Sequence, residues 1–426
     1  MFINSLTIEN FRGFENSKID FTDKVTVIVG KNGSGKTSVL EAAAVSAGTL
    51  FNSFKSISKP GITSKDAHNQ YFDMGNVIDV QPQYPVKIIS EGEINGKKLV
   101  WERSLVAENG RTTIVNAKEM TSLSEEYQNR LMKGDKELIL PLVAYYGTGR
   151  LWDQHREKKQ DLLKQNTRTN GYIDSLDGSA NIKLMLKWFQ KMAKKESDSN
   201  KPIPEYRVVR SAMEKFFITV TGAEKITVDY NSDTLEIDIS YFTEDRCEKI
   251  PLNQLSDGYR CAVSLVADIA YRMAVLNPAL LQDVLIKTSG LVLIDEIDLH
   301  LHPAWQRTIL HEISAIFPEV QFIVSTHAPA VIQSVRSENL IILENGHFRK
   351  PGSEIYGRDV NGTLKSIMNV KERPDYISDK FDSFYSYMDS EKYSEAADVL
   401  DNLEDLLGSD DSEIAACRVR LDLEQL

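Results

Sequence analysis

The sequence predicts an α/β fold in which helices cover a mixed β-sheet. Residues 24–29 form a β-branched run of strand length, and a glycine-rich loop and a helix follow it directly. Two later apolar runs, residues 291–294 and 320–324, are also of strand length, and each ends in polar residues. Ligands bind at such strand ends in doubly wound sheets. At 426 residues, the chain is long enough for one large domain and a smaller appended one.

The glycine-rich loop is the strongest local signal. It reads Gly30-Lys31-Asn32-Gly33-Ser34-Gly35-Lys36-Thr37, and Ser38 continues into the helix. The backbone N–H groups of such a loop and the N-terminus of the following helix form a partly positive seat for phosphates. The Lys36 ammonium supplies a point charge, and the Thr37 hydroxyl is suited to Mg²⁺. We therefore expect residues 30–38 to bind a nucleoside triphosphate, the alternative being a glycine turn without a ligand.

Functional side chains are also expected at the ends of the two later strands. Residues 291–294 are followed by adjacent carboxylates, of which Asp295 is expected to hold Mg²⁺ and Glu296 to orient or deprotonate the attacking water. A buried strand that merely ends in an acidic turn is the alternative. The run 320–324 ends in Ser-Thr-His. We expect His327 to contact the γ-phosphate, although a histidine taken alone is more often structural.

A second helix N-terminus lies between these motifs, at Leu-Ser-Asp-Gly-Tyr-Arg (residues 255–260). Apolar residues at helical spacing follow it, which makes Ser256 a natural N-cap. A capped N-terminus carries a partial positive charge and free N–H groups, so it can bind phosphate. Because the glycine loop already has its own helix, we expect Ser256, Asp257 and Gly258 to contact the nucleotide of a neighbouring copy. An ordinary capped helix is the alternative.

The ordered set of these four motifs resembles the ABC-type ATPases, in particular the SMC, RecF and OLD-like group. The resemblance spans most of the chain and implies a P-loop ABC-type ATPase head, with ATP and Mg²⁺ as cofactors. It implies that Lys36, Glu296 and His327 take part in hydrolysis. Residues 8–14 also look like the first strand of that group, which implies that Arg12 lies near the nucleotide.

Three segments suggest a closer resemblance, residues 144–152, 268–274 and 294–303. They look like the PtuA ATPases of the Septu anti-phage systems, which also accompany some retrons. That family implies head-to-tail dimers or larger assemblies that recruit or restrain an HNH nuclease supplied as a separate chain.

The sequence departs from the wider ABC pattern at several positions. Asp257 stands where Gly is usual and Tyr259 where Gln is common, so slow turnover is expected. Residues 145–149 are the best positional candidate for the Q-loop, but they contain no glutamine. His300 and His302, with Asp298 close by, could chelate zinc, because His-x-His is a ligand pattern. We favour the other interpretation, in which this segment lies at the dimer interface.

We divide the chain into four parts. Residues 1–150 and 251–357 are the two halves of the ATPase domain, residues 151–250 an inserted helical and hairpin lobe, and residues 358–426 a C-terminal helical region. No sustained heptad repeat lies between Thr37 and Ser256, which excludes long coiled-coil arms. A helical hairpin is expected near the C-terminus, either to dock a partner or second copy or to cover the sheet. That region is too short and too helical for the TOPRIM nuclease of OLD-like relatives.

Composition restricts the partners and the compartment. The net charge of −12 argues against a protein that coats nucleic acid, although a basic stretch within residues 155–195 leaves DNA as a candidate partner. That stretch is more simply a solvated helical face. No apolar run reaches the ~18 residues that cross a bilayer, and no export signal precedes the first strand. Three separated cysteines fit a reducing compartment, so the cytoplasm is expected.

The expected function is that of an ATPase subunit that senses nucleotide and regulates a separate nuclease in anti-phage defence. A RecF-like DNA-binding repair ATPase is the alternative. The energy subunit of a transporter is a second rival, against which the long insertion and the lack of a match to a membrane-docking segment weigh.

Overall fold

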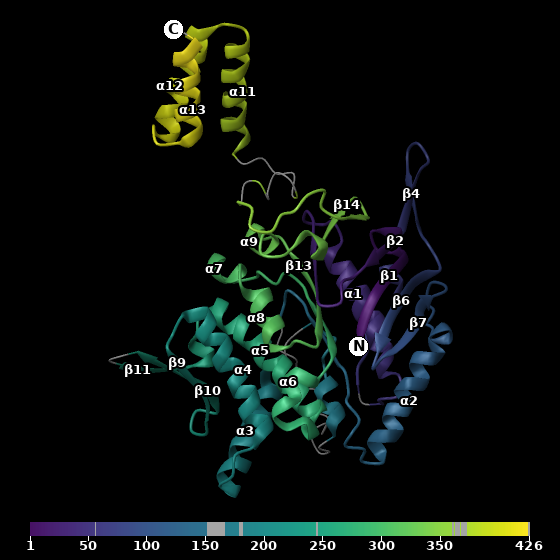
Figure 1. Ribbon diagram of the computed structural model, residues 1–426. Coiled ribbons are helices and arrows are strands. Elements are labelled where there is room, and N and C mark those ends of the chain that lie inside the picture. Colours follow the sequence, from purple (N-terminus) through teal and green to yellow (C-terminus); the bar gives the residue numbers. More distant parts are fainter. Residues whose placement is uncertain are drawn as a thin grey trace. The chain divides into compact units, whose positions relative to one another are not determined.

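The computed structural model describes residues 1–55, 57–150, 167–178, 182–243, 246–359, 362, 367 and 373–424. It divides into two compact units, Met1–Arg358 and Asp359–Leu426 (Figure 1). The described part of residues 151–250, predicted as an inserted lobe, belongs to the first unit, unit 1. Residues 155–164 of the predicted basic stretch lie outside the described residues.

Unit 1 is built from strands in several sheets. They are β1 (Phe2–Phe11), β2 (Phe14–Asp20), β3 (Val25–Val29), β4 (Asn69–Asp73), β5 (Ile78–Pro82), β6 (Val86–Ile94), β7 (Lys97–Leu105), β8 (Leu142–Tyr146), β9 (Lys225–Asn231), β10 (Glu236–Thr243), β11 (Arg246–Pro251), β12 (Gly290–Ile294), β13 (Val320–Thr326), β14 (Leu340–Glu344) and β15 (His347–Arg349).

Helices pack against these sheets. They are α1 (Lys36–Ala47), α2 (Lys118–Met132), α3 (Ile182–Ser199), α4 (Pro204–Thr221), α5 (Asp257–Leu276), α6 (Val284–Lys287), α7 (Pro303–Gln306), α8 (Ile309–Ile316) and α9 (Pro329–Ile332). None of the helices in the described ranges is both long enough and apolar enough to cross a bilayer.

A six-stranded sheet forms the centre of unit 1, in the order β15-β14-β3-β13-β12-β8. The five strands from β14 to β8 are parallel, and only β15 runs antiparallel. Every residue of β8, β12 and β13 is buried, as expected for parallel strands that are covered on both faces. The Asp-Glu pair, His327 and the phosphate loop follow β12, β13 and β3, which are neighbours in that order. All three motifs therefore lie at the sheet edge that the carboxyl ends of these parallel strands form.

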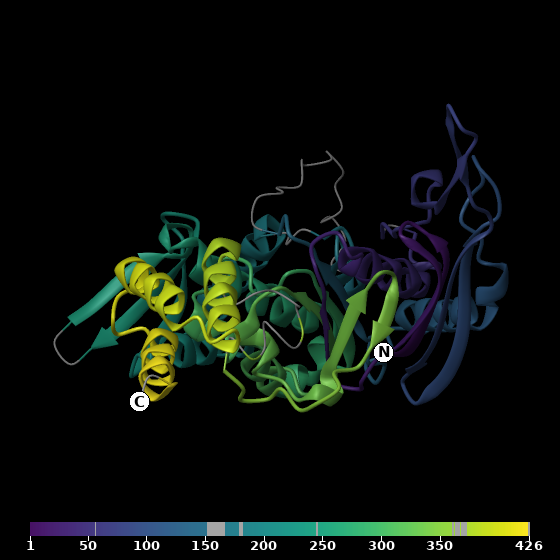
Figure 2. The ribbon, with the colours of Figure 1, turned by 90° about the horizontal axis from the view of Figure 1, so that it is seen from above.

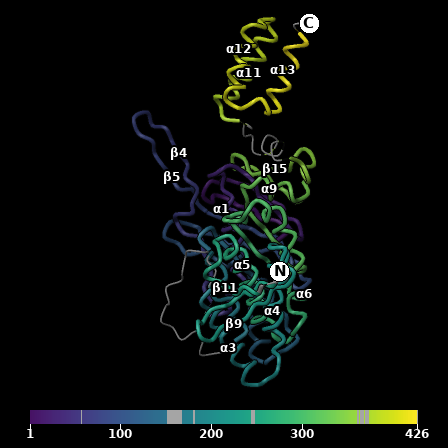
Figure 3. The backbone as a smooth tube through the Cα atoms, turned by 90° about the vertical axis from the view of Figure 1, so that its left-hand side faces the viewer, coloured from purple at the N-terminus to yellow at the C-terminus, as the bar shows by residue number. Residues whose placement is uncertain are grey.

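Two antiparallel sheets flank this centre. The sheet β2-β1-β6-β7 lies at one end of unit 1 and the sheet β11-β10-β9 at the other (Figures 1 and 2). The first is tied to α1, because the Trp101 indole donates to the carbonyl of Ser46 at 3.1 Å. The hairpin β4–β5 extends away from the body of unit 1, and nearly all of its residues are exposed (Figure 3).

Helix α5 runs through the core of unit 1, and it is buried on all sides from Cys261 to Ala274. A buried ion pair fixes it: Arg272 donates to the Asp268 carboxylate at 2.6 Å, and both side chains are at most 2% exposed. The same carboxylate accepts from the hydroxyl of Tyr146 on β8 at 2.7 Å. Arg272 also donates to the carbonyls of Gly171 and Ile173, each at 2.9 Å. The helix is therefore anchored to the edge strand of the central sheet.

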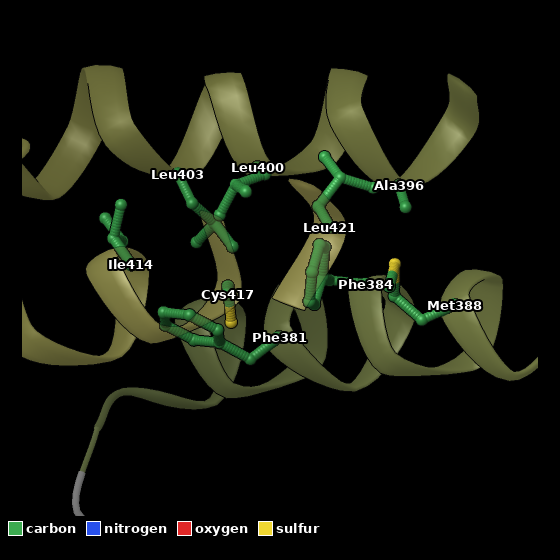
Figure 4. Packing of buried hydrophobic residues seen from close by; sticks show 9 residues of the cluster. All are labelled: Phe381, Phe384, Met388, Ala396, Leu400, Leu403, Ile414, Cys417 and Leu421. Atoms are coloured by element: carbon green, nitrogen blue, oxygen red, sulfur yellow. The ribbon is translucent and has the colours of Figure 1, made fainter. Parts of the chain in front are cut away.

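The second unit, unit 2, consists of α11 (Asp375–Asp389), α12 (Tyr393–Leu407) and α13 (Ser412–Glu424). The predicted helical hairpin corresponds to α12 and α13, and α11 is a third helix that was not predicted. Its Phe381, Phe384 and Met388 recur at helical spacing and complete a small core (Figure 4). Residues 359–426 contain 17 acidic and 7 basic residues, so they carry a net charge of −10 out of the chain's −12.

Replacing Arg272 by Met tests the anchor of α5. Because this change leaves the Asp268 carboxylate buried without its counter-ion, we expect the free energy of unfolding to fall by about 3–5 kcal/mol in urea denaturation. The matched control is Lys287→Met, which breaks an exposed pair with Asp283 at the same i,i+4 spacing. This control should cost at most about 0.5 kcal/mol. Equal losses from the two substitutions would contradict the anchoring role.

Candidate nucleotide-binding site

The phosphate loop connects β3 to α1 with backbone that requires glycine. Gly35 has φ of 105°, and a Cβ there would lie 2.9 Å from the ring of Phe14. A Cβ on Gly30 would lie 2.5 Å from the carbonyl oxygen of Leu343 on β14. Both positions therefore exclude other residues. Within the loop, the N–H of Ser34 donates to the carbonyl of Lys31 at 3.2 Å.

Lys36 begins α1, and its ammonium lies over the loop. Nζ donates to the carbonyls of Gly30 at 3.0 Å and Lys31 at 3.1 Å. Burial lowers the pKa of Lys36, and the nearby carboxylates of Asp295, Glu296 and Asp298 act in the opposite direction. Phosphate oxygens would offer this ammonium charged acceptors, which bind more strongly than carbonyls.

Asp295 joins three elements at the end of β12. One carboxylate oxygen accepts from the Thr37 hydroxyl on α1 at 2.7 Å, and the other accepts from the Ser325 hydroxyl on β13. The side chain is almost completely buried, at 1% exposure. Hydroxyl and carboxylate oxygens are the ligands that Mg²⁺ prefers, and here one of each is already in contact. Thr37 and Asp295 therefore fit a Mg²⁺ ion, which would neutralise phosphate charge when bound.

Glu296 has an unusual backbone conformation. Its φ is 47°, in the left-handed region, and its N–H donates to the Ser325 hydroxyl at 2.8 Å. Burial, followed by the charges of Asp295 and Asp298, raises the pKa of the Glu296 carboxyl. A carboxylate with a raised pKa is a better general base near neutral pH.

His327 follows β13 at the same sheet edge. Burial, followed by the charge of Lys36, lowers the pKa of its imidazole. The ring is therefore neutral at neutral pH, and it can donate one hydrogen bond to a phosphate oxygen.

Arg12 lies in the turn between β1 and β2 and pairs with two carboxylates. It contacts Glu41, which is four residues after Thr37 on α1, and Asp66 at 2.9 Å. These ion pairs hold the guanidinium beside the first turns of α1. A contact between Arg12 and the nucleotide stays a prediction.

Ser256 and Asp257 are exposed at the start of α5. Ser256 occupies the N-cap position, but its side chain makes no capping hydrogen bond. Asp257 pairs with Arg260 at 2.8 Å. The carboxylates that act on Lys36 are those of Asp295, Glu296 and Asp298, and Asp257 is not one of them.

Arg150 is the main functional candidate that the sequence analysis missed. It lies in the loop after β8, directly after the predicted Q-loop residues 145–149, and its guanidinium donates to the carbonyls of Asp295 and Glu296. The only sequence feature that marks Arg150 is its position directly after the glycine-rich turn, residues 147–149, that follows an apolar strand. Ser325 was also missed as an individual residue, although its motif was recognised.

The possible zinc ligands have structural roles. Asp298 accepts a hydrogen bond from the Thr326 hydroxyl, and His302 caps α7 by accepting from the N–H of Ala304 at 3.3 Å. Within the described ranges, no three His, Cys, Asp or Glu side chains gather into a metal site.

Two family models match the chain, one described as "AAA domain" over residues 5–213 and one as "AAA domain, putative AbiEii toxin, Type IV TA system" over residues 155–333. "Retron Vc95 probable ATPase" of Vibrio cholerae serotype O1 biovar El Tor is 26% identical over 419 residues, which covers 87% of this chain and 80% of that protein. "Septu protein PtuA" of Bacillus mycoides (strain KBAB4) is 25% identical over 425 residues, which covers 95% of this chain and 50% of that protein. This chain is similar over 80% or more of its length to proteins named as probable ATPases of retrons and as Septu PtuA.

Among solved structures, the Smc head bound to the C-winged helix domain of ScpA superposes with a TM-score of 0.44 and 16% identity. The superposition covers 84% of this chain and 98% of that one.

Replacing Lys36 by Ala tests the loop. The substitution removes the charge that faces the phosphates, so we expect the Kd for MgATP to rise by at least about tenfold in calorimetry. The control is Lys24→Ala, because Lys24 precedes β3 and its ammonium contacts Pro318 and Glu319 instead of the loop. Unchanged affinity in Lys36→Ala would argue against phosphate binding at this loop.

Proposed function

We propose that this chain is an ATPase subunit whose nucleotide state controls a separate HNH-type nuclease in anti-phage defence. ATPase activity is supported by its homologues and by the residues that meet at the sheet edge. The observation that carries the proposal is the hydrogen-bonded set of Thr37, Asp295 and Ser325. It joins the phosphate loop to a carboxylate 258 residues further along the chain.

Each side chain of the site has a separate role in hydrolysis. Lys36 and the N–H groups of residues 30–38 bind the phosphates, while Thr37 and Asp295 hold Mg²⁺. Glu296 accepts a proton from the attacking water. The neutral imidazole of His327 donates a hydrogen bond to the γ-phosphate, so the strand β13 responds to whether that phosphate is present.

The site is completed by a second copy. The start of α5 presents an exposed Ser256 whose hydroxyl is not used for capping, together with the partial positive charge of a helix N-terminus. Arg260 pairs with Asp257 and offsets the negative charge that departs from the usual ABC pattern. In a head-to-tail dimer, this helix end of one protomer would face the nucleotide on the loop of its partner.

Mixing two inactive variants tests the shared site. Lys36→Ala and Ser256→Arg should each abolish hydrolysis, because each variant spoils both sites of a symmetric dimer. After the two proteins are mixed and allowed to exchange, half of the dimers are mixed and contain one intact site. ATPase activity should therefore recover to about a quarter of the wild-type rate.

The control for this experiment is a mixture of Lys36→Ala with Glu296→Gln. Both residues belong to the half of the site that one protomer supplies, so no mixed dimer contains an intact site. No recovery in the first mixture, or equal recovery in both, would contradict the shared site.

Control of a separate nuclease rests on the homology to PtuA, whose family the sequence resembles. The described part of the chain contains no cluster of metal ligands that could serve a nuclease of its own. An HNH nuclease encoded beside this chain should therefore co-purify with it, and its DNA cleavage should change between MgATP and MgADP. The Glu296→Gln variant, which retains ATP, should hold the complex in the ATP state. Cleavage that is identical in all nucleotide states would contradict the proposal.

One surface favours the alternative of a DNA-binding repair ATPase. Lys183, Lys187, Lys191 and Lys194 lie along α3 at helical spacing. Lys187 and Lys191 also line a pocket with Trp188 and Tyr271, and cations beside aromatic rings suit single-stranded nucleic acid. The alternative requires salt-sensitive, ATP-dependent DNA binding that is lost when the four lysines are changed to glutamine together. Binding that survives this change would exclude α3 as the DNA-binding surface.

A further inference from the structure

Arg150 is a buried cation that connects three elements of unit 1. Its side chain is 4% exposed. Nη1 donates to the carbonyls of Gly147 at 3.2 Å and Asp295 at 2.7 Å, and Nη2 donates to the carbonyl of Glu296 at 2.9 Å. Nε donates to the thiol sulfur of Cys261 on α5 at 3.2 Å. The loop after β8, the end of β12 and helix α5 therefore meet at one guanidinium.

This arrangement is costly for the fold. All four acceptors of Arg150 in the described structure are carbonyls or a thiol, whereas the equally buried Arg272 pairs with the carboxylate of Asp268. Removing a guanidinium from water is unfavourable, and carbonyls offset only part of that penalty. The nearby charge that compensates is that of Glu296, because the charge of Arg150 acts against burial and lowers the pKa of the Glu296 carboxyl. The guanidinium is therefore held beside the carboxyl that the proposed mechanism uses as its base.

The contact with Glu296 explains what the arginine does. A left-handed backbone at a non-glycine residue is strained and must be held by its surroundings. The Ser325 hydroxyl accepts a hydrogen bond from the N–H of Glu296, and Arg150 donates one to the carbonyl of Glu296. The two peptide groups that set the direction of the Glu296 side chain are therefore both fixed.

The contact with Cys261 links this carboxylate to the start of α5, and two further contacts reinforce the link. A Cβ on Gly258 would lie 2.5 Å from the carbonyl oxygen of His300, so the helix start packs directly on the segment after Glu296. The ring centroids of Tyr259 and Trp305 are 4.2 Å apart. The first turns of α5 and the segment from Glu296 to Trp305 are thus expected to move together.

We propose that Arg150 is a positioning residue for ATP hydrolysis, which orients Glu296 and couples its position to α5 of the same protomer. The inference rests on the proposed ATPase function. Since α5 contacts the partner's nucleotide in that proposal, a shift of α5 in one site reaches the general base of the other site through this guanidinium.

The test compares Arg150→Met and Arg150→Lys with a matched control, Arg168→Met. Arg168 is partly buried and likewise donates to backbone carbonyls, those of Leu276 and Asp135, which lie outside the nucleotide site. We expect Arg150→Met to lower kcat by about 10- to 100-fold, because a small misplacement of a catalytic group has effects of that size. The Kd for MgATP should stay within about twofold, and Arg150→Lys, which keeps the charge, should recover part of kcat.

A double substitution separates positioning from general support of the fold. In the Glu296→Gln background there is no general base left to aim, so adding Arg150→Met should leave the residual rate unchanged. A full additional loss would overturn the proposal. So would wild-type kcat in Arg150→Met, or a Kd that rises as much as kcat falls. If Arg150→Met does not fold, Arg150→Lys decides, and a wild-type kcat there overturns the proposal.

Failure of the inference can be told apart from failure of the proposed function. A wild-type protein without MgATPase activity would refute the function and the inference together. An active wild-type protein with an equally active Arg150→Met variant would refute the inference alone.

Discussion

The organisation of the site depends on the two hydrogen bonds that the buried carboxylate of Asp295 accepts. A buried charge is tolerated only where hydrogen bonds compensate for lost water, and here hydroxyl groups from α1 and β13 supply them. The same two bonds bring the phosphate loop, the acidic strand end and the strand that leads to His327 to one place. Stability and the proposed chemistry therefore impose the same requirement: the groups that solvate Asp295 in the protein belong to the elements that we propose to surround the bound phosphates.

A second layer of buried polar groups connects this centre to α5. The ion pair of Asp268 and Arg272 holds the helix against β8, and Arg150 holds its first turns against the end of β12. Hydrogen bonds and ion pairs in an apolar core depend on direction, because a donor must point at its acceptor. These contacts therefore restrict the position of α5. The helix is thus a rigid connection between the interior of the unit and the surface where Ser256 is exposed.

Much of this architecture could be predicted from the sequence, because local patterns encode it. The strand, glycine loop and helix around Lys36 and the strands that end at Asp295 and His327 depend on neighbours in sequence, and the structure contains them. Arg150 could not be found in this way, because the carbonyls of Asp295 and Glu296 to which it donates lie 145 and 146 residues further along the chain. Helix α11 was not predicted, although its buried Phe381 and Phe384 recur at helical spacing. The ion pairs of Arg12 likewise required the three-dimensional fold.

The division of charge between the two units changes how the composition should be interpreted. With −10 in residues 359–426, the remaining 358 residues carry a net charge of only −2. The overall acidity therefore describes a small helical appendage rather than the ATPase body. A polyanion near this protein would meet a nearly neutral body whose local potential is set by individual helices such as α3, and long-range repulsion would come from the appendage alone.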